Sequence, residues 1–246
     1  MPFSSQGMPD YSSEATEAEI TKAQAARHAV SKNLPAIQKK VPPLVRLIAV
    51  TKTFPSTVVR AAYDEGIRDF AENKVQEALA KQAELEDLTD VIWHFIGHIQ
   101  SNKARKVVEN FDWIHSVDSL KLASRLDRQA AELGKRPKCC LQVKVVPDDT
   151  KSGFEVDDLL AKLTDLDALM HIQICGLMVI APYGRTATEN REIFERGQAL
   201  AKRIAQMGWK RITMDELSMG MSGDFESAIA AGATLIRIGS GLFGQR

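Results

Sequence analysis

The chain has 246 residues and no net formal charge, because 32 lysines and arginines balance 32 aspartates and glutamates. Its 44% hydrophobic and 26% charged residues are typical of a globular protein with a buried core, which excludes a disordered or coiled-coil chain. The length suits one α/β barrel, and the balanced charge argues against a nucleic acid as the main partner.

Predicted secondary structure alternates along almost the whole chain. Residues 1–15 are small and polar and are set apart as a flexible tail. Apolar side chains in residues 16–40 have the spacing of an amphipathic helix, which Pro35 kinks or ends. Short apolar or β-branched runs predict strands at residues 46–51, 67–71, 91–96, 113–117, 141–146, 174–180, 213–217 and 235–238. Helical periodicity predicts helices at residues 57–65, 75–86, 102–109, 120–133, 156–169, 188–207 and 223–231.

This alternation predicts the fold class. Strands that alternate regularly with helices pair in parallel through right-handed crossovers. Eight repeats favour a closed (β/α)8 TIM barrel over an open doubly wound sheet. No change in composition marks a second domain. We therefore expect one α/β barrel domain over residues 16–246, with an extra N-terminal helix.

The first predicted strand leads into a lysine. Lys52 follows Ile48 and Val50 at intervals of two, so all three side chains are expected to face the barrel interior. Partial burial at the barrel mouth lowers the pKa of such an amine, which can then form a Schiff base with a carbonyl. A lysine that simply extends its amine into solvent is the commoner arrangement, so Lys52 alone does not define a site.

Two loops rich in glycine and serine follow the last two predicted strands, at residues 218–224 and 239–244. Glycine amides approach an anion closely, and the corresponding loops of this fold commonly hold phosphate groups. Turn or capping roles explain either loop alone, whereas the pair favours phosphate. Together with Lys52, the loops predict a small phosphorylated aldehyde or ketone as the ligand.

An arginine adds a constraint on that ligand. Arg237 lies on the last predicted strand, two residues before Gly239 and on the same face. A structural salt bridge inside the barrel explains Arg237 equally well. Against a pyridine nitrogen, an arginine can only donate a hydrogen bond, which keeps that nitrogen unprotonated and weakens the ring as an electron sink.

Five ordered motifs resemble those of a known family: residues 49–52 (AVTK), 72–77 (ENKVQE), 93–103 (WHFIGHIQSNK), 217–224 (LSMGMSGD) and 236–240 (IRIGS). Across residues 45–246 the sequence resembles the pyridoxal-phosphate homeostasis proteins, which are single barrels related to the N-terminal domain of alanine racemase. The chain departs from the family at Ala71, where glycine is common, and lacks the usual short C-terminal tail.

The resemblance implies a site for pyridoxal 5'-phosphate (PLP). Lys52 would hold the cofactor as a Schiff base, and Arg237 would face its pyridine nitrogen. Lys151 matches a family lysine near the mouth, for which a role in cofactor transfer is a candidate. The implied cofactor-binding residues are Lys52, Asn73, Ser218, Met221, Ser222, Arg237, Gly239 and Ser240, of which Ser222, Gly239 and Ser240 would hold the phosphate.

The same resemblance implies a function in vitamin B6 and PLP homeostasis. The protein would act as a non-catalytic reservoir or carrier of PLP, with PLP-dependent apoenzymes as candidate recipients. The absence of the second racemase domain removes a source of dimer contacts and favours a monomer.

Two enzyme hypotheses stay open beside this one. A racemase needs a base on each face of the substrate, and Lys52 supplies one. In alanine racemases a tyrosine from a second domain supplies the other, whereas here only Tyr183 is placed near the mouth, which leaves weak racemase activity open. A Schiff-base aldolase acting on a sugar phosphate would use Lys52 and the phosphate loops but would leave Arg237 without a role.

Other partners and compartments are less favoured. Three cysteines do not form a disulfide framework in a chain of this length, which favours a reducing compartment. The longest uncharged apolar run, residues 176–183, is shorter than the roughly 18 residues of a membrane span, and the N-terminus lacks a targeting signal. His94, His98 and His115 show no metal-binding motif. We expect a cytoplasmic protein that binds neither a membrane nor a metal.

Overall fold

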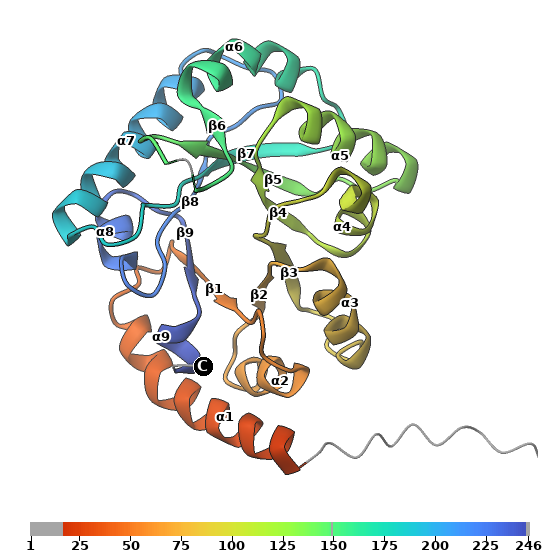
Figure 1. Ribbon diagram of the computed structural model, residues 1–246, viewed down its shortest axis with the longest axis vertical. Helices are drawn as coiled ribbons and strands as arrows, with labels where there is room; N and C mark the ends of the chain where they lie inside the picture. Colours follow the sequence, from red (N-terminus) through yellow and green to blue (C-terminus); the bar gives the residue numbers. More distant parts are fainter. Residues whose placement is uncertain (1–16, 149, 245–246) are drawn as a thin grey trace, which may run out of the picture.

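Eight parallel strands close on themselves in the computed structural model, which describes residues 17–148 and 150–244 (Figure 1). Neighbouring strands follow the order β4-β3-β2-β1-β9-β8-β7-β5, and pairing of β4 with β5 completes the ring. The strands are β1 (Arg46–Val50), β2 (Asp69–Glu72), β3 (Ile92–Phe95), β4 (Trp113–Val117), β5 (Lys138–Lys144), β7 (Gln173–Met178), β8 (Glu216–Ser218) and β9 (Leu235–Ile238). The predicted (β/α)8 barrel is confirmed.

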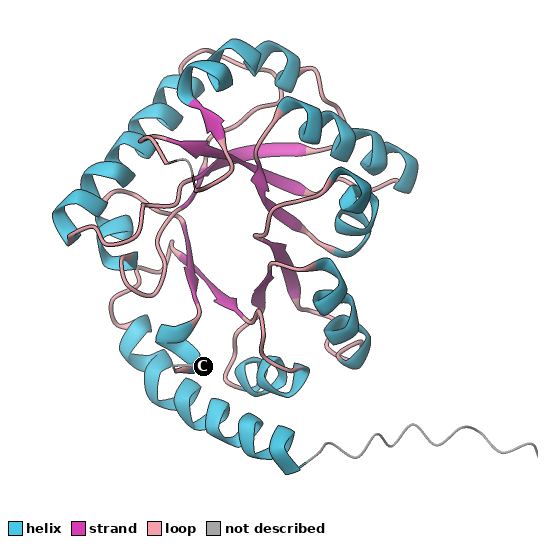
Figure 2. Cartoon of the chain, viewed as in Figure 1, coloured by secondary structure: helices cyan, strands magenta, loops and turns pink. Residues whose placement is uncertain are grey.

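Helices surround the strands on the outside of the ring (Figure 2). They are α1 (Glu17–Gln38), α2 (Ser56–Asp64), α3 (Val75–Glu84), α4 (Ala104–Asn110), α5 (Leu120–Leu133), α6 (Val156–Asp167), α7 (Ala187–Ala205), α8 (Phe225–Ala230) and α9 (Ser240–Phe243), with a 3-10 turn η1 (Ser101–Lys103) before α4. Each predicted strand and helix is present, with ends shifted by a few residues. Two short elements were not predicted: α9 and a strand β6 (Phe154–Glu155) that pairs with the end of β5. The tail predicted at residues 1–15 falls outside the described residues.

Local signals account for the sharpest helix ends. The side chain of Ser119 caps α5 by accepting a hydrogen bond from the backbone N–H of Leu122 at 3.3 Å. Gly134 ends the same helix in the left-handed conformation that glycine tolerates best. Thr186 and Glu189 form a reciprocal capping box at the start of α7.

The N-terminal helix α1 packs beside the helices that follow the first and last strands of the barrel. α1 continues past Pro35 for one turn and ends at Gln38. Its buried face includes Val30 and Leu34, and it packs against α2 and α9. The side chain of Asn33 donates a hydrogen bond to the carbonyl oxygen of Leu242 on α9, at 3.1 Å. The first and last helices therefore lie together (Figure 1).

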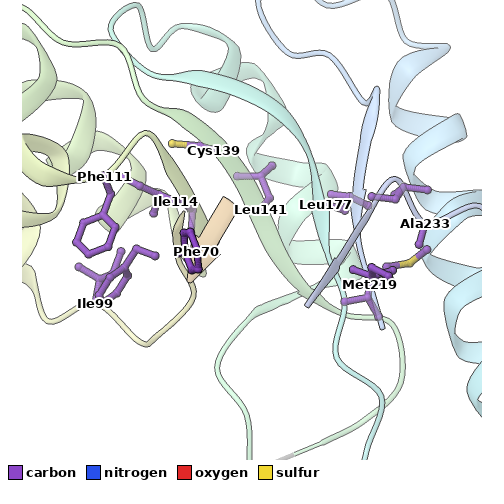
Figure 3. Packing of buried hydrophobic residues seen from close by; sticks show 14 of the residues in the cluster. Phe70, Ile99, Phe111, Ile114, Cys139, Leu141, Leu177, Met219 and Ala233 are labelled. Carbon is purple, nitrogen blue, oxygen red and sulfur yellow. The ribbon is translucent and has the colours of Figure 1, made fainter. Parts of the chain in front are cut away.

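Apolar side chains pack on both sides of the barrel wall. The larger cluster fills the layer between strands and helices, where Phe70, Leu141 and Leu177 are fully buried (Figure 3). A smaller cluster fills the barrel interior: Ile48, Val50, Ala71, Trp113, Cys140, Cys175, Met178 and Leu235. Cys139 and Cys140 lie on opposite sides of the wall, as alternation along a strand requires, and the three cysteines are buried and unpaired. Among the described residues, no helix is both long and apolar enough to cross a membrane.

The outer layer should account for much of the stability. Leu126 on α5 is completely buried, so Leu126→Ala is expected to lower the free energy of unfolding by about 2–5 kcal/mol through lost burial and a cavity. Leu44 is 92% exposed, so Leu44→Ala should change the free energy of unfolding by less than about 0.5 kcal/mol. Urea denaturation of both variants measures the difference, and equal losses would contradict this account of the core.

Candidate functional site

A cavity of about 480 Å³ opens at the carboxyl ends of β1, β8 and β9. Its lining residues are Val50, Lys52, Ile96, Met221, Ser222, Gly223, Arg237, Gly239 and Ser240. Six of the eight sequence-predicted site residues are among them, and they come from opposite ends of the chain. In a TIM barrel, this face is where binding and catalytic residues gather.

Pairing of β1 with β9 brings the lysine and the arginine to one cavity. The register sets Ile48 opposite Arg237. Two residues further along β1, Val50 lies so near Gly239 that a Cβ added to that glycine would be 3.5 Å from the Val50 Cβ. Lys52 is two residues further again, in the turn after β1, where it is half-buried and lines the cavity with Val50.

The two glycine-rich loops are tied together by one hydroxyl. Ser222 Oγ accepts hydrogen bonds from the backbone N–H groups of Gly239 at 3.2 Å and Gly241 at 3.0 Å. A Cβ on Gly241 would lie only 3.2 Å from the Cβ of Ser222, so glycine permits this close approach. The side chain of Asp224 fixes the first loop by accepting a hydrogen bond from the N–H of Met221 at 2.6 Å. Backbone donors and hydroxyls therefore cluster at one end of the cavity.

Arg237 is a buried cation whose contacts are neutral. Only 2% of the residue is exposed, and burial lowers its pKa to about 10, which still leaves the guanidinium charged at neutral pH. One terminal nitrogen donates to Ser218 Oγ at 2.5 Å and the other to the carbonyl oxygen of Val179 at 3.4 Å. A hydroxyl and a carbonyl hold Arg237, so the salt bridge considered from sequence is not what fixes it. Ser218 lies behind Arg237 and does not line the cavity.

Asn73 follows β2 beside the lysine. Val50 pairs with Ala71, and Lys52 and Asn73 each come two residues after this pair, just past the ends of β1 and β2. The Asn73 Oδ1 atom is buried and has no hydrogen-bond partner among the described residues. An unsatisfied buried carbonyl oxygen is energetically unfavourable, which indicates that an additional donor belongs there. The cavity lining itself does not include Asn73.

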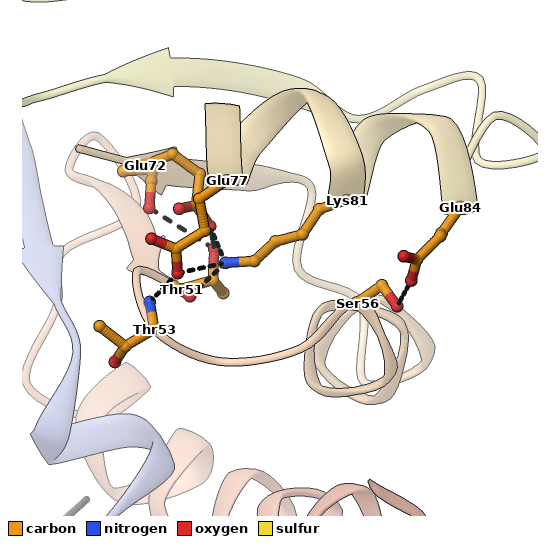
Figure 4. Close-up of polar contacts among 8 residues, drawn as sticks. Thr51, Thr53, Ser56, Glu72, Glu77, Lys81 and Glu84 are labelled. Carbon is orange, nitrogen blue, oxygen red and sulfur yellow. Dashed lines mark hydrogen bonds and ion pairs between the residues drawn. The ribbon is translucent and has the colours of Figure 1, made fainter. Parts of the chain in front are cut away.

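A buried ion pair outside the barrel wall anchors the segment that carries Lys52 (Figure 4). Lys81 on α3 is 5% exposed and contacts Glu72 Oε1 at 2.6 Å, while Glu72 is fully buried. The Lys81 ammonium also donates to the carbonyl oxygen of Thr51 at 2.8 Å. The hydroxyl of Thr51 donates to the same Glu72 oxygen at 2.7 Å. The residue before Lys52 is thus held through both its backbone and its side chain.

The residue after Lys52 is held as well. Thr53 has a positive φ of 67°, which is unfavourable for a residue with a branched Cβ. Its backbone N–H donates to Glu77 Oε1 at 2.6 Å, and Glu77 lies 3.7 Å from Lys81. We call Thr51, Glu72, Glu77 and Lys81 the Lys81 cluster. Sequence analysis missed it, although a lysine one turn after Glu77 on a helix was an available signal.

Residues that bear on the alternative activities lie elsewhere. Tyr183 is fully exposed, and Tyr63 donates its hydroxyl proton to Asp90. No tyrosine lines the cavity in the part of the chain that the structure describes. Lys151 pairs with Asp148 at 2.6 Å and lines a separate, small cavity.

The histidines do not form a metal site in the described ranges, where no group of three suitable ligands occurs. His94 and His115 are fully buried inside the barrel. His98 is exposed, and its Nδ1 lies 3.0 Å from Asp118 and 3.3 Å from Ser152. Both contacts involve the same nitrogen, so this group lacks the geometry of a catalytic triad.

Known proteins resemble this chain in sequence. A sequence profile described as "Alanine racemase, N-terminal domain" matches residues 26–246. A pyridoxal phosphate homeostasis protein of Synechocystis sp. is 52% identical over 206 residues, covering 84% of this chain and 94% of the relative. The protein of that name from Escherichia coli K12 is 40% identical over 212 residues, covering 83% and 87%.

Solved structures resemble it in fold. PipY of Synechococcus elongatus PCC7942, determined with PLP bound, has a TM-score of 0.84 at 52% identity, with 87% of this chain and 100% of PipY covered. An alanine racemase of Clostridium difficile 630 has a TM-score of 0.70 at 16% identity, with 89% of this chain and 57% of the racemase covered. At that identity the racemase shows a shared fold alone.

The Lys81 cluster gives a pH-dependent prediction. Burial raises the pKa of Glu72 despite the attraction of Lys81, and Lys81→Met removes that attraction. The variant should lose about 3–5 kcal/mol of stability at pH 8, because it leaves a buried carboxylate without its cation.

The loss should be smaller at pH 5. A carboxyl whose pKa is higher in the folded than in the unfolded state takes up a proton on folding, so it favours folding at low pH and loses that effect as pH rises. Urea denaturation at both pH values measures this, and Lys162→Ala, which removes an exposed lysine, is the control. A loss independent of pH would contradict the assignment to Glu72.

Proposed function

The chain belongs to the pyridoxal phosphate homeostasis protein family, and on that premise we propose that it binds PLP in the cavity beside Lys52. PLP combines a phosphate, an aldehyde and a pyridine nitrogen. The observation that carries the proposal is the convergence of an amine, a buried guanidinium and two glycine-rich loops in one cavity.

The residues present fit these three groups. The Ser222 hydroxyl, which the amides of Gly239 and Gly241 hold in place, and the close approach at Gly241 form a compact cradle of the kind that suits a phosphate. Ser240 extends the cradle along the cavity lining. The unsatisfied Asn73 Oδ1 offers an acceptor beside the lysine. Met221, 40% exposed, borders the cavity with an apolar side chain.

The side chains then have distinct tasks. PLP, when bound, supplies an aldehyde carbon that accepts an amine and a ring that withdraws electrons. Lys52 supplies the amine for a Schiff base, and the Lys81 cluster keeps the Lys52 backbone in place. Arg237 presents a donor that cannot lose its proton at neutral pH, so the ring nitrogen stays unprotonated. A ring in that state is a weak electron sink, which suits storage of the cofactor more than catalysis.

We place the protein in vitamin B6 and PLP homeostasis as a reservoir or carrier without a reaction of its own. The names of the relatives and the single amine in the cavity lining support this role. PLP-dependent apoenzymes are the proposed recipients. The proposal includes a monomeric state. It also includes a cytoplasmic location, because a reducing compartment keeps the buried cysteines as free thiols.

Covalent labelling tests the lysine. Purified wild-type protein with added PLP should show a visible absorption band, and borohydride reduction should place the label on Lys52 by mass mapping. Lys52→Ala should lose both the band and the label but stay folded, since Lys52 is half-buried at the mouth. Lys162→Ala should keep both.

Two results would count against the proposal. The first is label in Lys52→Ala protein at the wild-type stoichiometry, which would remove Lys52 from the site. The second is turnover of an amino acid by PLP-loaded wild-type protein, which would replace the carrier by an enzyme such as a racemase.

The phosphate cradle gives a separate prediction. Ser222→Ala removes one hydroxyl and the link between the loops, so the affinity for PLP should fall about tenfold, as loss of a hydrogen bond to a charged group predicts. Affinity for pyridoxal, which lacks the phosphate, should change far less. Ser227→Ala on α8 is the control, because that hydroxyl donates to the carbonyl oxygen of Ala187. If titrations showed that Ser222→Ala weakens the binding of PLP and of pyridoxal equally, the assignment of the cradle to the phosphate would be contradicted.

A further inference from the structure

A row of hydrogen-bonded side chains crosses the barrel interior beneath the cavity. We propose that Asp69, His94, His115 and Ser218 form a one-way hydrogen-bond relay that positions Arg237 toward the pyridine nitrogen of the cofactor. Asp69, at the far end, accepts the last hydrogen bond of the relay, while Asp224 is the carboxylate whose charge acts on Arg237. The inference rests on the proposed function, because it assigns positioning residues to that site.

Hydrogen-bond distances connect the relay without a gap. Asp69 Oδ1 lies 2.9 Å from His94 Nε2, and His94 Nδ1 lies 2.9 Å from His115 Nε2. His115 Nδ1 lies 2.7 Å from Ser218 Oγ, which accepts from Arg237 at 2.5 Å. Each histidine therefore uses both ring nitrogens within the relay.

Strand alternation explains how five distant residues meet. β2 pairs with β3 so that Ala71 of the interior cluster lies opposite His94, and Asp69 is two residues before Ala71 on the same face. His115 is two residues after Trp113, which also belongs to the interior cluster. Ser218 and Arg237 complete the set from β8 and β9. The relay therefore runs from the amino end of the barrel to the cavity at the carboxyl end.

The two ends of the relay fix the direction of every hydrogen bond. A guanidinium can only donate, so the Ser218 oxygen accepts from Arg237. Because the Asp69 carboxylate only accepts and both imidazoles are neutral, the order of donors from that end leaves His115 Nδ1 as the acceptor of the Ser218 proton. His115 then carries its proton on Nε2 and donates it to His94 Nδ1. His94 in turn carries its proton on Nε2 and donates to the carboxylate of Asp69, which only accepts. One set of tautomers satisfies all four contacts.

Burial is consistent with that set. His94, His115 and Ser218 have no exposed surface. Burial lowers the pKa of both imidazoles, so both rings are neutral at neutral pH, as the donor order requires. In addition to Asp69, the charged groups acting on the two rings are Arg46 from β1, Asp112 before β4 and Arg237 from β9. Arg46 also forms a salt bridge with Asp69 at 3.6 Å, so the Asp69 carboxylate faces a cation as well as His94.

The relay has a consequence for ligand orientation. Without the Ser218 acceptor, one guanidinium nitrogen of Arg237 would lose its partner in a buried site, which is unfavourable. The side chain would then turn toward an anion at the phosphate end of the same cavity. A fixed acceptor behind Arg237 holds it back from the phosphate and directs its remaining donors at the ring. The polar relay residues, which lie beside the apolar cluster of the barrel interior, would therefore serve to position Arg237.

Histidine tautomers test the relay without any cofactor. Nitrogen-15 NMR of the unloaded wild-type protein should show His94 and His115 both neutral and protonated at Nε2, from pH 6 to pH 8. Protonation at Nδ1 in either ring, or a charged ring in this range, would overturn the relay. Ser218→Ala and Ser218→Thr form a matched pair, since threonine keeps the hydroxyl.

A second measurement follows the ring nitrogen of bound, nitrogen-15 labelled PLP. In Ser218→Ala its resonance should move downfield toward that of a pyridine without a hydrogen bond, and PLP affinity should fall about tenfold. Ser218→Thr should restore both. Asp69→Asn keeps an accepting oxygen but removes the charge, so it should give a smaller shift in the same direction.

Asp127→Asn provides the control. Asp127 on α5 is partly buried and pairs with His171 at 3.2 Å, outside the relay. Its substitution should leave the PLP ring nitrogen unchanged. A Ser218→Ala resonance identical to that of wild type would overturn the positioning role of Ser218, and an unchanged Asp69→Asn resonance would overturn the part of Asp69 in the relay. Failure of wild-type protein to bind PLP would reject the proposed function instead, and the histidine spectra would still decide whether the relay exists.

Discussion

Parallel pairing between β1 and β9 joins the first and last strands of the chain, and the cavity depends on that pairing. The register that sets Ile48 opposite Arg237 also sets the end of β1 beside the loop after β9. A slip of one residue would turn every side chain of β9 to the other side of the wall and would direct Arg237 into the helical layer. α1, which packs on α2 and α9, covers the outside of this junction. The two ends of the described chain thus build one site.

Two polar systems lie on opposite sides of the barrel wall and meet at the cavity. The Lys81 cluster lies outside, between the strands and α3, and fixes the backbone on both sides of Lys52. The relay lies inside and ends at Arg237. Buried ionic and polar groups rarely add stability compared with apolar ones, but they specify one arrangement when every partner is present. Here each system fixes one of the two charged side chains of the cavity.

This arrangement suits a protein that holds a reactive cofactor without using it. Lys52 and Arg237 are placed by contacts that exist before any ligand arrives, so little reorganisation is needed on binding. In the proposed complex, Arg237 opposite the ring nitrogen would limit the electron-withdrawing power of the ring. The fold is shared with an alanine racemase at 16% identity, and a fold by itself does not decide which function the residues around a cavity perform.

The sequence by itself determined the strands, the helices and the face on which the cavity residues lie, because side-chain alternation and helical spacing are local properties. It placed Lys52, Ser222 and Arg237 at strand ends, and the family resemblance supplied their proposed roles. It did not reveal that Ser218 stands behind Arg237, that Lys81 reaches Glu72, or that His94 and His115 connect Asp69 to the cavity. Those contacts join residues from different strands and helices, and their distances are set only when the barrel closes. Tertiary structure alone decided them, since hydrogen bonding requires atoms within about 3 Å and the sequence specifies no distance between separate elements.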